Sequence, residues 1–224
     1  MKKRTIALIA SLTLAGHSFS QVIYSNDFTG AAGKKTVAAV GAQFQHQFVG
    51  GAALDGEGHL VAINTTAGNT LRVNLGDALK NAPAVKLSWS LTATRGDRWT
   101  AIGFHGENVS KVNENTANGG PWLFSTVRAT VLQGGTGVTG SKTTFQSHKG
   151  GDVLNYTMIY RPATQSVDLM LNGKVLKRNE VIAHKDPSGA AAAPVLKFLQ
   201  FQIWESELET RAVVDSVSVE ILSE

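Results

Sequence analysis

The stretch DVLNYTMIYRPATQSVDLMLNGKVL, residues 152–176, contains two alternating segments and a turn signal that together predict antiparallel β-structure. Residues 153–160 (VLNYTMIY) and 166–172 (SVDLMLN) alternate apolar and polar side chains, which is the period of a strand with one buried face. Asn172 and Gly173 then stand at the two centre positions of a tight turn, where positive φ angles are required. The stretch therefore predicts a β-hairpin on a half-buried sheet.

Similar segments recur along most of the chain. Residues 85–94 (VKLSWSLTAT) alternate over ten positions, and strand patterns also occupy 59–66, 70–75, 99–105, 196–204 and 213–222. Glycine-rich and asparagine-rich turns separate them, and no convincing amphipathic helix pattern follows the N-terminal region. Many short strands with frequent turns predict an all-β fold, an antiparallel two-sheet jelly-roll sandwich.

The N-terminal residues indicate export. Three basic residues at positions 2–4 precede an apolar run at 5–16, and Ser18 and Ser20 occupy the small-residue positions before a cleavage site. We expect a signal peptide over residues 1–20 and a single mature domain over residues 21–224, secreted or periplasmic and not held at a membrane after cleavage. The alternative is an uncleaved anchor helix.

Charge and cysteine content narrow the function classes. The chain has 21 Lys plus Arg and 17 Asp plus Glu, so removal of three basic residues leaves 18 against 17, a net charge of about +1. A nucleic-acid-binding protein needs a basic face, so nucleic acid is not an expected partner. The absence of cysteine excludes disulfides, thiolate metal sites and a cysteine nucleophile.

The order of these segments resembles a known superfamily. Residues 152–176, the opening VIYSNDFTG, the pair WTAIGFH and GGPWLFSTV, and the closing VVDSVSVEIL are similar to the concanavalin A-like lectin/glucanase sandwiches, particularly the LamG-type jelly-roll domains of exported bacterial proteins. The resemblance covers most of the mature chain. It implies the fold, whereas members of the superfamily include carbohydrate-binding modules, adhesion domains and glycosidases.

Three glutamates, Glu205, Glu207 and Glu209, alternate in FQIWESELETR. Many glucanases of the superfamily carry Glu-x-Asp-x-Glu on a strand, with the outer glutamates as nucleophile and acid/base, and here Glu207 replaces the aspartate. A continuous strand would place the three acids on the same face as the preceding apolar row, at a cost of several kcal/mol each if they lacked partners. We therefore expect the strand to end near Trp204 and the glutamates to lie in a solvated loop, with the catalytic role as the alternative.

Two aspartates suggest a calcium site. Asp215 shares the alternating phase of Val217 and Val219 in the last predicted strand, and Asp27 follows the first. Jelly-roll carbohydrate-binding modules often tie these strands together with calcium, which requires oxygen ligands. The alternative is that Asp215 lies at a bulge or turn and that Asp27 is a turn residue.

The expected ligand-binding residues are Trp122, Trp204 and Arg128. Trp122 follows a predicted loop, and Trp204 lies in the opposite phase from the apolar residues of its strand, so either ring could stack on a sugar. The alternative for Trp122 is a structural plug beneath a turn.

These observations predict an exported, non-catalytic carbohydrate-binding or adhesion-type module with a polysaccharide or glycan partner. The alternatives are a glycoside hydrolase or polysaccharide lyase on the same fold, or a purely structural extracellular domain.

Overall fold

A computed structural model describes residues 20–33, 38–66, 68–106, 119–133, 142–145, 148–182 and 194–223. The expected signal-peptide run lies almost entirely outside these residues. No helix within the described ranges is long and apolar enough to cross a membrane.

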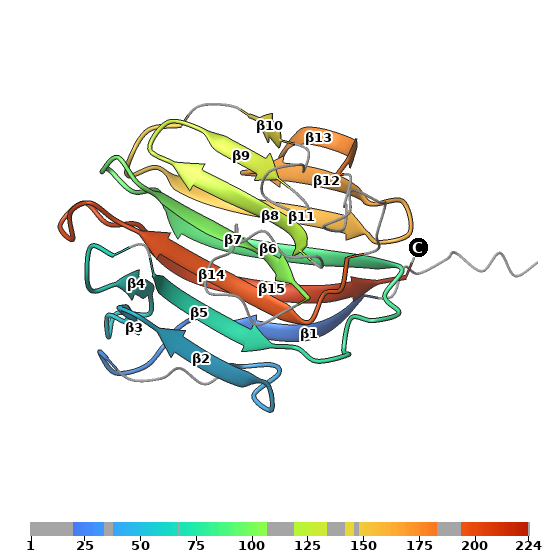
Figure 1. Cartoon of the computed structure of the whole chain (residues 1–224), viewed down its shortest axis with the longest axis horizontal. Helices are drawn as coiled ribbons and strands as arrows, with labels where there is room; N and C mark the ends of the chain where they lie inside the picture. The colour runs from blue at the N-terminus through green and yellow to red at the C-terminus, as the bar shows by residue number, and fades with distance from the viewer. Residues whose placement is uncertain are drawn as a thin grey trace, which may run out of the picture.

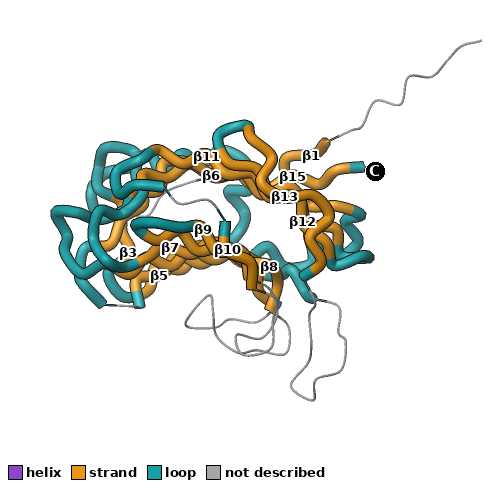
Figure 2. Tube along the Cα trace, turned by 90° about the horizontal axis from the view of Figure 1, so that it is seen from above, coloured by secondary structure: helices purple, strands orange, loops and turns teal. Residues whose placement is uncertain are grey.

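The described residues form two antiparallel sheets stacked as a sandwich, which confirms the predicted fold class (Figures 1 and 2). The strands are β1 (Ser20–Asn26), β2 (Gln45–Val49), β3 (Ala52–Leu54), β4 (Leu60–Ala62), β5 (Asn69–Asn74), β6 (Ala84–Thr92), β7 (Trp99–His105), β8 (Gly119–Thr126), β9 (Thr130–Gln133), β10 (Lys142–Thr144), β11 (Val153–Arg161), β12 (Ser166–Leu171), β13 (Lys174–Val181), β14 (Phe198–Trp204) and β15 (Val213–Leu222).

The eight-stranded sheet has the order β13-β12-β11-β6-β15-β4-β3, with β1 also paired to β15. The seven-stranded sheet has the order β10-β9-β8-β7-β14-β5-β2. The segments WTAIGFH and GGPWLFSTV form β7 and β8, which pair with each other. The first and last strands are neighbours, as the calcium hypothesis requires.

Residues 152–176 form the antiparallel strands and the hairpin that their sequence predicts. β11 pairs with β12, and β12 pairs with β13 across a turn in which Asn172 has φ 49° and Gly173 has φ 75°. Asparagine and glycine tolerate this left-handed region at little cost, so the turn sequence fixes the hairpin.

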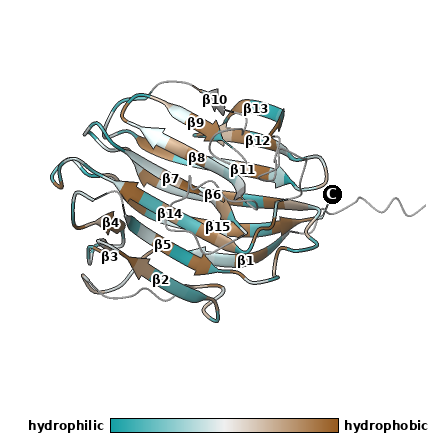
Figure 3. Ribbon diagram, viewed as in Figure 1, coloured by the Kyte–Doolittle hydropathy of each residue, from teal (hydrophilic) through white to brown (hydrophobic). Residues whose placement is uncertain are grey.

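One hydrophobic core fills the space between the sheets, and apolar and polar residues alternate along the strands that enclose it (Figure 3). On β6, Leu87, Trp89 and Leu91 point inward, and the Trp89 ring stacks on Tyr156 of β11 at a centroid distance of 5.0 Å. On β14, Phe201 and Ile203 point inward. These inward positions agree with the alternating patterns of residues 85–94 and 196–204.

Asp215 does not interrupt the inward row, because β15 contains a bulge. The register of β15 against β6 shifts between Val214 and Ser216, so the phase of the strand changes at Asp215. Val214, Val217 and Val219 are buried, whereas Asp215 is partly exposed and contacts Ser90 on the outer side of the sheet. The expected inward position of Asp215 is wrong, and the alternative position at a bulge is confirmed.

Candidate functional site on the seven-stranded sheet

A row of aromatic rings lies on the outer face of the seven-stranded sheet. Trp99 and Trp204 are directly opposite each other on β7 and β14, and their rings meet edge to face at 5.7 Å between centroids. Phe124 of β8 packs edge to face on Trp99 at 4.7 Å and on Trp122 at 4.0 Å. The pairing of β14, β7 and β8 thus gathers four rings that come from three separate segments of the sequence.

The Trp122 ring lies at one end of the row and is buried. Its exposed fraction is 1 %, whereas Trp99, Phe124 and Trp204 are partly exposed. Gly103 of β7 lies opposite Trp122, and a Cβ atom at that position would overlap the Trp122 Cβ, so glycine lets the two strands carry this ring. The expectation of an exposed Trp122 is wrong, and its burial matches the plug interpretation.

Trp204 is partly exposed, as its phase in the strand predicts. The Arg98 guanidinium lies over the Trp204 ring, 4.5 Å from the centroid, which is a cation–π contact. Arg98 also lies 3.5 Å from the Asp97 carboxylate. A charged group therefore adjoins the exposed rings.

Arg128 lies in a depression of about 400 Å³ at the same end of the sheet. The depression is formed by the turn between β8 and β9, the loop before β7 and the loop after β14, so it adjoins Trp99 and Trp204 along the chain. Its lining residues are Arg95, Gly96, Asp97, Val127, Arg128, Ser206 and Glu207. The fold therefore brings the predicted Trp204 and Arg128 to one end of the molecule, together with Glu207. We call the exposed rings and this depression the tryptophan end.

The other half of the same face is polar. Gln200 and Gln202 share the outer face of β14 with Trp204, and Arg72 of β5 lies opposite Gln200. Arg72 Nη1 donates to Gln47 Oε1 at 3.2 Å. A second depression of about 200 Å³ is lined by Gln45, Gln47, Arg72, Asn74 and Phe198.

Gln200 has no exposed surface, and its Nε2 and Oε1 atoms have no hydrogen-bond partner in the part of the chain that the structure describes. The buried Thr70 hydroxyl on β5 is also without a partner there. A buried polar group without a partner costs about 1–3 kcal/mol, so such groups are uncommon in native proteins. Sequence reasoning missed this polar half, although the QFQ triplet at 200–202 was visible.

Glu205 is buried beneath the tryptophan end, contrary to the expected solvated loop. β14 ends at Trp204, as predicted, but the Glu205 side chain turns inward and has no exposed surface. Its Oε1 accepts the backbone N–H of Ala212 and its Oε2 accepts the Thr94 hydroxyl, both at 2.7 Å. Burial raises the pKa of Glu205, although these two hydrogen bonds and Arg211 act in the opposite direction.

Glu207 and Glu209 are exposed, as expected. The three glutamates do not line one strand face, because the strand ends before them and Glu205 points into the protein. The bond from Ala212 closes the 205–212 loop on itself, and the bond from Thr94 holds this loop to the segment that follows β6. This arrangement gives Glu205 a structural role.

The two aspartates of the predicted calcium site make separate contacts. Asp27 is exposed, and its Oδ1 accepts the backbone N–H and the hydroxyl of Thr29, at 3.2 and 2.9 Å. The Asp215 carboxylate contacts the hydroxyl of Ser90 and the imidazole of His59. Calcium binding between them stays a prediction.

No family model matches the sequence, and no curated protein matches it. Solved structures do share the fold. The binding domain of botulinum neurotoxin DC, in complex with SialylT, has a TM-score of 0.59 and 11 % identity over 88 % of this chain and 47 % of its own. Botulinum neurotoxin type C, which depends on two ganglioside molecules to enter cells, has the same TM-score and coverage at 12 % identity.

A Trypanosoma rangeli sialidase mutant with trans-sialidase activity has a TM-score of 0.57 and 12 % identity, over 88 % of this chain and 30 % of its own. This chain therefore spans less than half the length of these proteins. At such identities the likeness shows the β-sandwich fold alone.

Proposed function

We propose that this protein is an exported, non-catalytic carbohydrate-binding module of the concanavalin A-like, LamG type, which binds a polysaccharide or glycan at the tryptophan end. The observation that carries the proposal is the pair of partly exposed rings, Trp99 and Trp204, beside a depression lined by charged and polar groups. Sugars offer apolar C–H faces to such rings and hydroxyl groups to such side chains, so the rings and the depression together fit one ligand.

The solved neighbours support a glycan partner by analogy of fold. Two of them are described with a ganglioside or a sialylated ligand, and a third is a sialidase. The identity of the glycan bound by this chain does not follow from theirs, because the residues of the tryptophan end belong to this sequence.

The role of Glu205 favours binding over hydrolysis. A retaining glycosidase needs two carboxyl groups about 5–5.5 Å apart that both reach the sugar. Glu205 faces inward, with both oxygens accepting hydrogen bonds from Ala212 and Thr94. Glu207 then remains as a lining residue that can accept hydrogen bonds from sugar hydroxyls.

A binding screen tests the proposal. The mature chain is incubated with insoluble polysaccharides and run through gels that contain soluble ones, with the Trp204→Ala variant as the comparison. We expect retention by at least one polysaccharide and its loss in the variant, without release of reducing ends. Release of reducing ends that depends on Glu207 would replace the binding function with the hydrolase alternative.

A further inference from the structure

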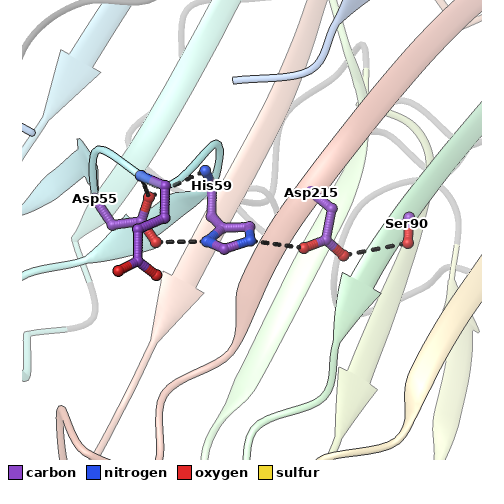
Figure 4. A network of polar contacts seen from close by, with 5 residues as sticks. Asp55, His59, Ser90 and Asp215 are labelled. Atoms are coloured by element: carbon purple, nitrogen blue, oxygen red, sulfur yellow. Dashed lines mark hydrogen bonds and ion pairs between the residues drawn. The ribbon is translucent and has the colours of Figure 1, made fainter. Parts of the chain in front are cut away.

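The loop between β3 and β4 gathers three metal-ligating side chains. Asp55, Glu57 and His59 alternate with two glycines in the sequence DGEGH, and one ligand atom from each lies within 4.8 Å of the others (Figure 4). Gly56 and Gly58 have φ angles of 92° and 96°, a conformation that other residues rarely adopt. The glycines thus permit a backbone that turns all three side chains toward one point.

The imidazole of His59 is held from both sides. Its Nδ1 lies 2.5 Å from Asp55 Oδ2, and its Nε2 lies 3.4 Å from Asp215 Oδ1. The other oxygen of Asp215 accepts the Ser90 hydroxyl at 3.2 Å. An imidazole that ligates a metal through one nitrogen commonly donates its other N–H to a carboxylate, so Asp215 is placed to orient His59 with Nδ1 toward the loop.

The bulge in β15 is part of this arrangement. Without the register shift between Val214 and Ser216, Asp215 would point into the apolar core. The bulge turns it outward to the sheet surface, where it reaches His59. An irregularity in the longest strand thus places the carboxylate that orients the imidazole.

Charge also favours a cation at this loop. Asp55, Glu57 and Asp215 surround a single imidazole, and none of these carboxylates forms an ion pair with a lysine or arginine in the ranges that the structure describes. Three carboxylates with at most one imidazolium leave net negative charge. A bound divalent cation would neutralise it.

We propose that Asp55, Glu57 and His59 bind one divalent transition-metal ion, with Asp215 and Ser90 as positioning residues. One imidazole nitrogen and two carboxylate oxygens suit Zn²⁺ and similar ions, whereas calcium takes oxygen ligands. Three protein ligands leave a further position for water. The ion would join the β3–β4 loop to β15 through His59, on the eight-stranded sheet and independently of the glycan site.

Zinc titration of the metal-stripped mature chain tests the site. We expect saturable binding of one Zn²⁺ by calorimetry and a rise in melting temperature, because the ion binds the folded chain. His59→Gln and Glu57→Gln should each weaken binding at least tenfold, since each removes a ligand. Asp215→Asn should weaken it by about 10–100-fold, the range for residues that orient a ligand.

Glu209→Gln is the matched control, because this exposed glutamate lies in another loop, and it should bind zinc as the unaltered chain does. Asp55 is not replaced, since its Oδ1 also accepts the backbone N–H groups of Glu57 and His59 and a variant could disturb the loop. Absence of saturable zinc binding would overturn the proposal. Equal affinity in the Glu57→Gln and His59→Gln variants would do so as well.

Discussion

Thr94 donates its hydroxyl hydrogen bond to a Glu205 oxygen at 2.7 Å, and this contact joins the second residue after β6 to the first residue after β14. The same Thr94 oxygen accepts the backbone N–H of Gly96, and Arg95 donates its N–H to the carbonyl oxygen of Thr210. Together with the Ala212 N–H, these bonds fix the loops that form the tryptophan end. The glutamate that a catalytic interpretation would use is instead part of the frame of the site.

Replacement of Glu205 by alanine should therefore destabilise the protein. The change leaves the buried N–H of Ala212 without its acceptor, so we expect a loss of about 1–3 kcal/mol in the free energy of unfolding. Urea unfolding measures it, with Glu209→Gln as an exposed control that should stay within about 0.5 kcal/mol. A Glu205→Ala variant as stable as the control would show that the hydrogen bonds of Glu205 do not stabilise the fold.

The raised pKa of Glu205 predicts a specific pH dependence. Burial is the main cause, and it makes the folded chain hold this proton more tightly than the unfolded chain, whose glutamate pKa is about 4.3. The contribution of Glu205 to stability is therefore greatest below the unfolded pKa and falls as pH rises through the folded value. The Glu205→Gln variant does not titrate at this position.

Urea unfolding of both proteins at a series of pH values isolates this effect. The free energy of unfolding of the unaltered chain minus that of Glu205→Gln should fall as pH rises from the unfolded to the folded pKa of Glu205. Above the folded pKa the difference should be constant. A difference that rises with pH would mean that the folded pKa is lowered.

Much of the fold can be predicted from local patterns, because the alternation of apolar and polar residues indicates which face of each strand is buried. The alternation in residues 85–94 and 196–204 matches the buried positions of Trp89 and Phe201, and Asn172-Gly173 favours a hairpin through its φ angles. Asp215 was misplaced because alternation assumes a regular strand, and a bulge shifts the phase without a sequence signal.

The site was harder to predict, because its contacts join distant segments. The burial of Glu205 depends on Thr94, which precedes it by more than a hundred residues, and the ring row depends on how β7, β8 and β14 pair. The sequence DGEGH shows three potential metal ligands, but the contact of His59 with Asp215 depends on the pairing of β4 with β15.

Gln200→Met should stabilise the protein. The substitution keeps the length of the side chain and removes two buried polar atoms that have no partner among the described residues, so we expect a gain of about 1 kcal/mol or more. Urea unfolding of the variant and of the unaltered chain measures this gain. A loss of stability would indicate that Gln200 is hydrogen-bonded in solution.

The calcium prediction has a direct thermal test. An ion shared by Asp27 and Asp215 would stabilise the folded chain by about 2.7 kcal/mol at a hundredfold excess over Kd, or roughly 5–11 °C in melting temperature. Calcium added to the metal-stripped chain should raise the melting temperature, except in Asp27→Asn and Asp215→Asn. His59→Gln should keep the calcium response, which separates this ion from the proposed zinc. An unchanged melting curve would end the calcium hypothesis.

The binding affinity of Trp204→Ala for the polysaccharide found in the screen tests the central claim most directly. Loss of the exposed ring and of its contact with Arg98 should weaken binding at least tenfold, about 1.4 kcal/mol, while the melting temperature stays close to that of the unaltered chain. Ile63→Ala, which removes an exposed apolar side chain between β4 and β5, should bind normally. Undiminished binding by a folded Trp204→Ala variant would contradict a glycan site at the tryptophan end.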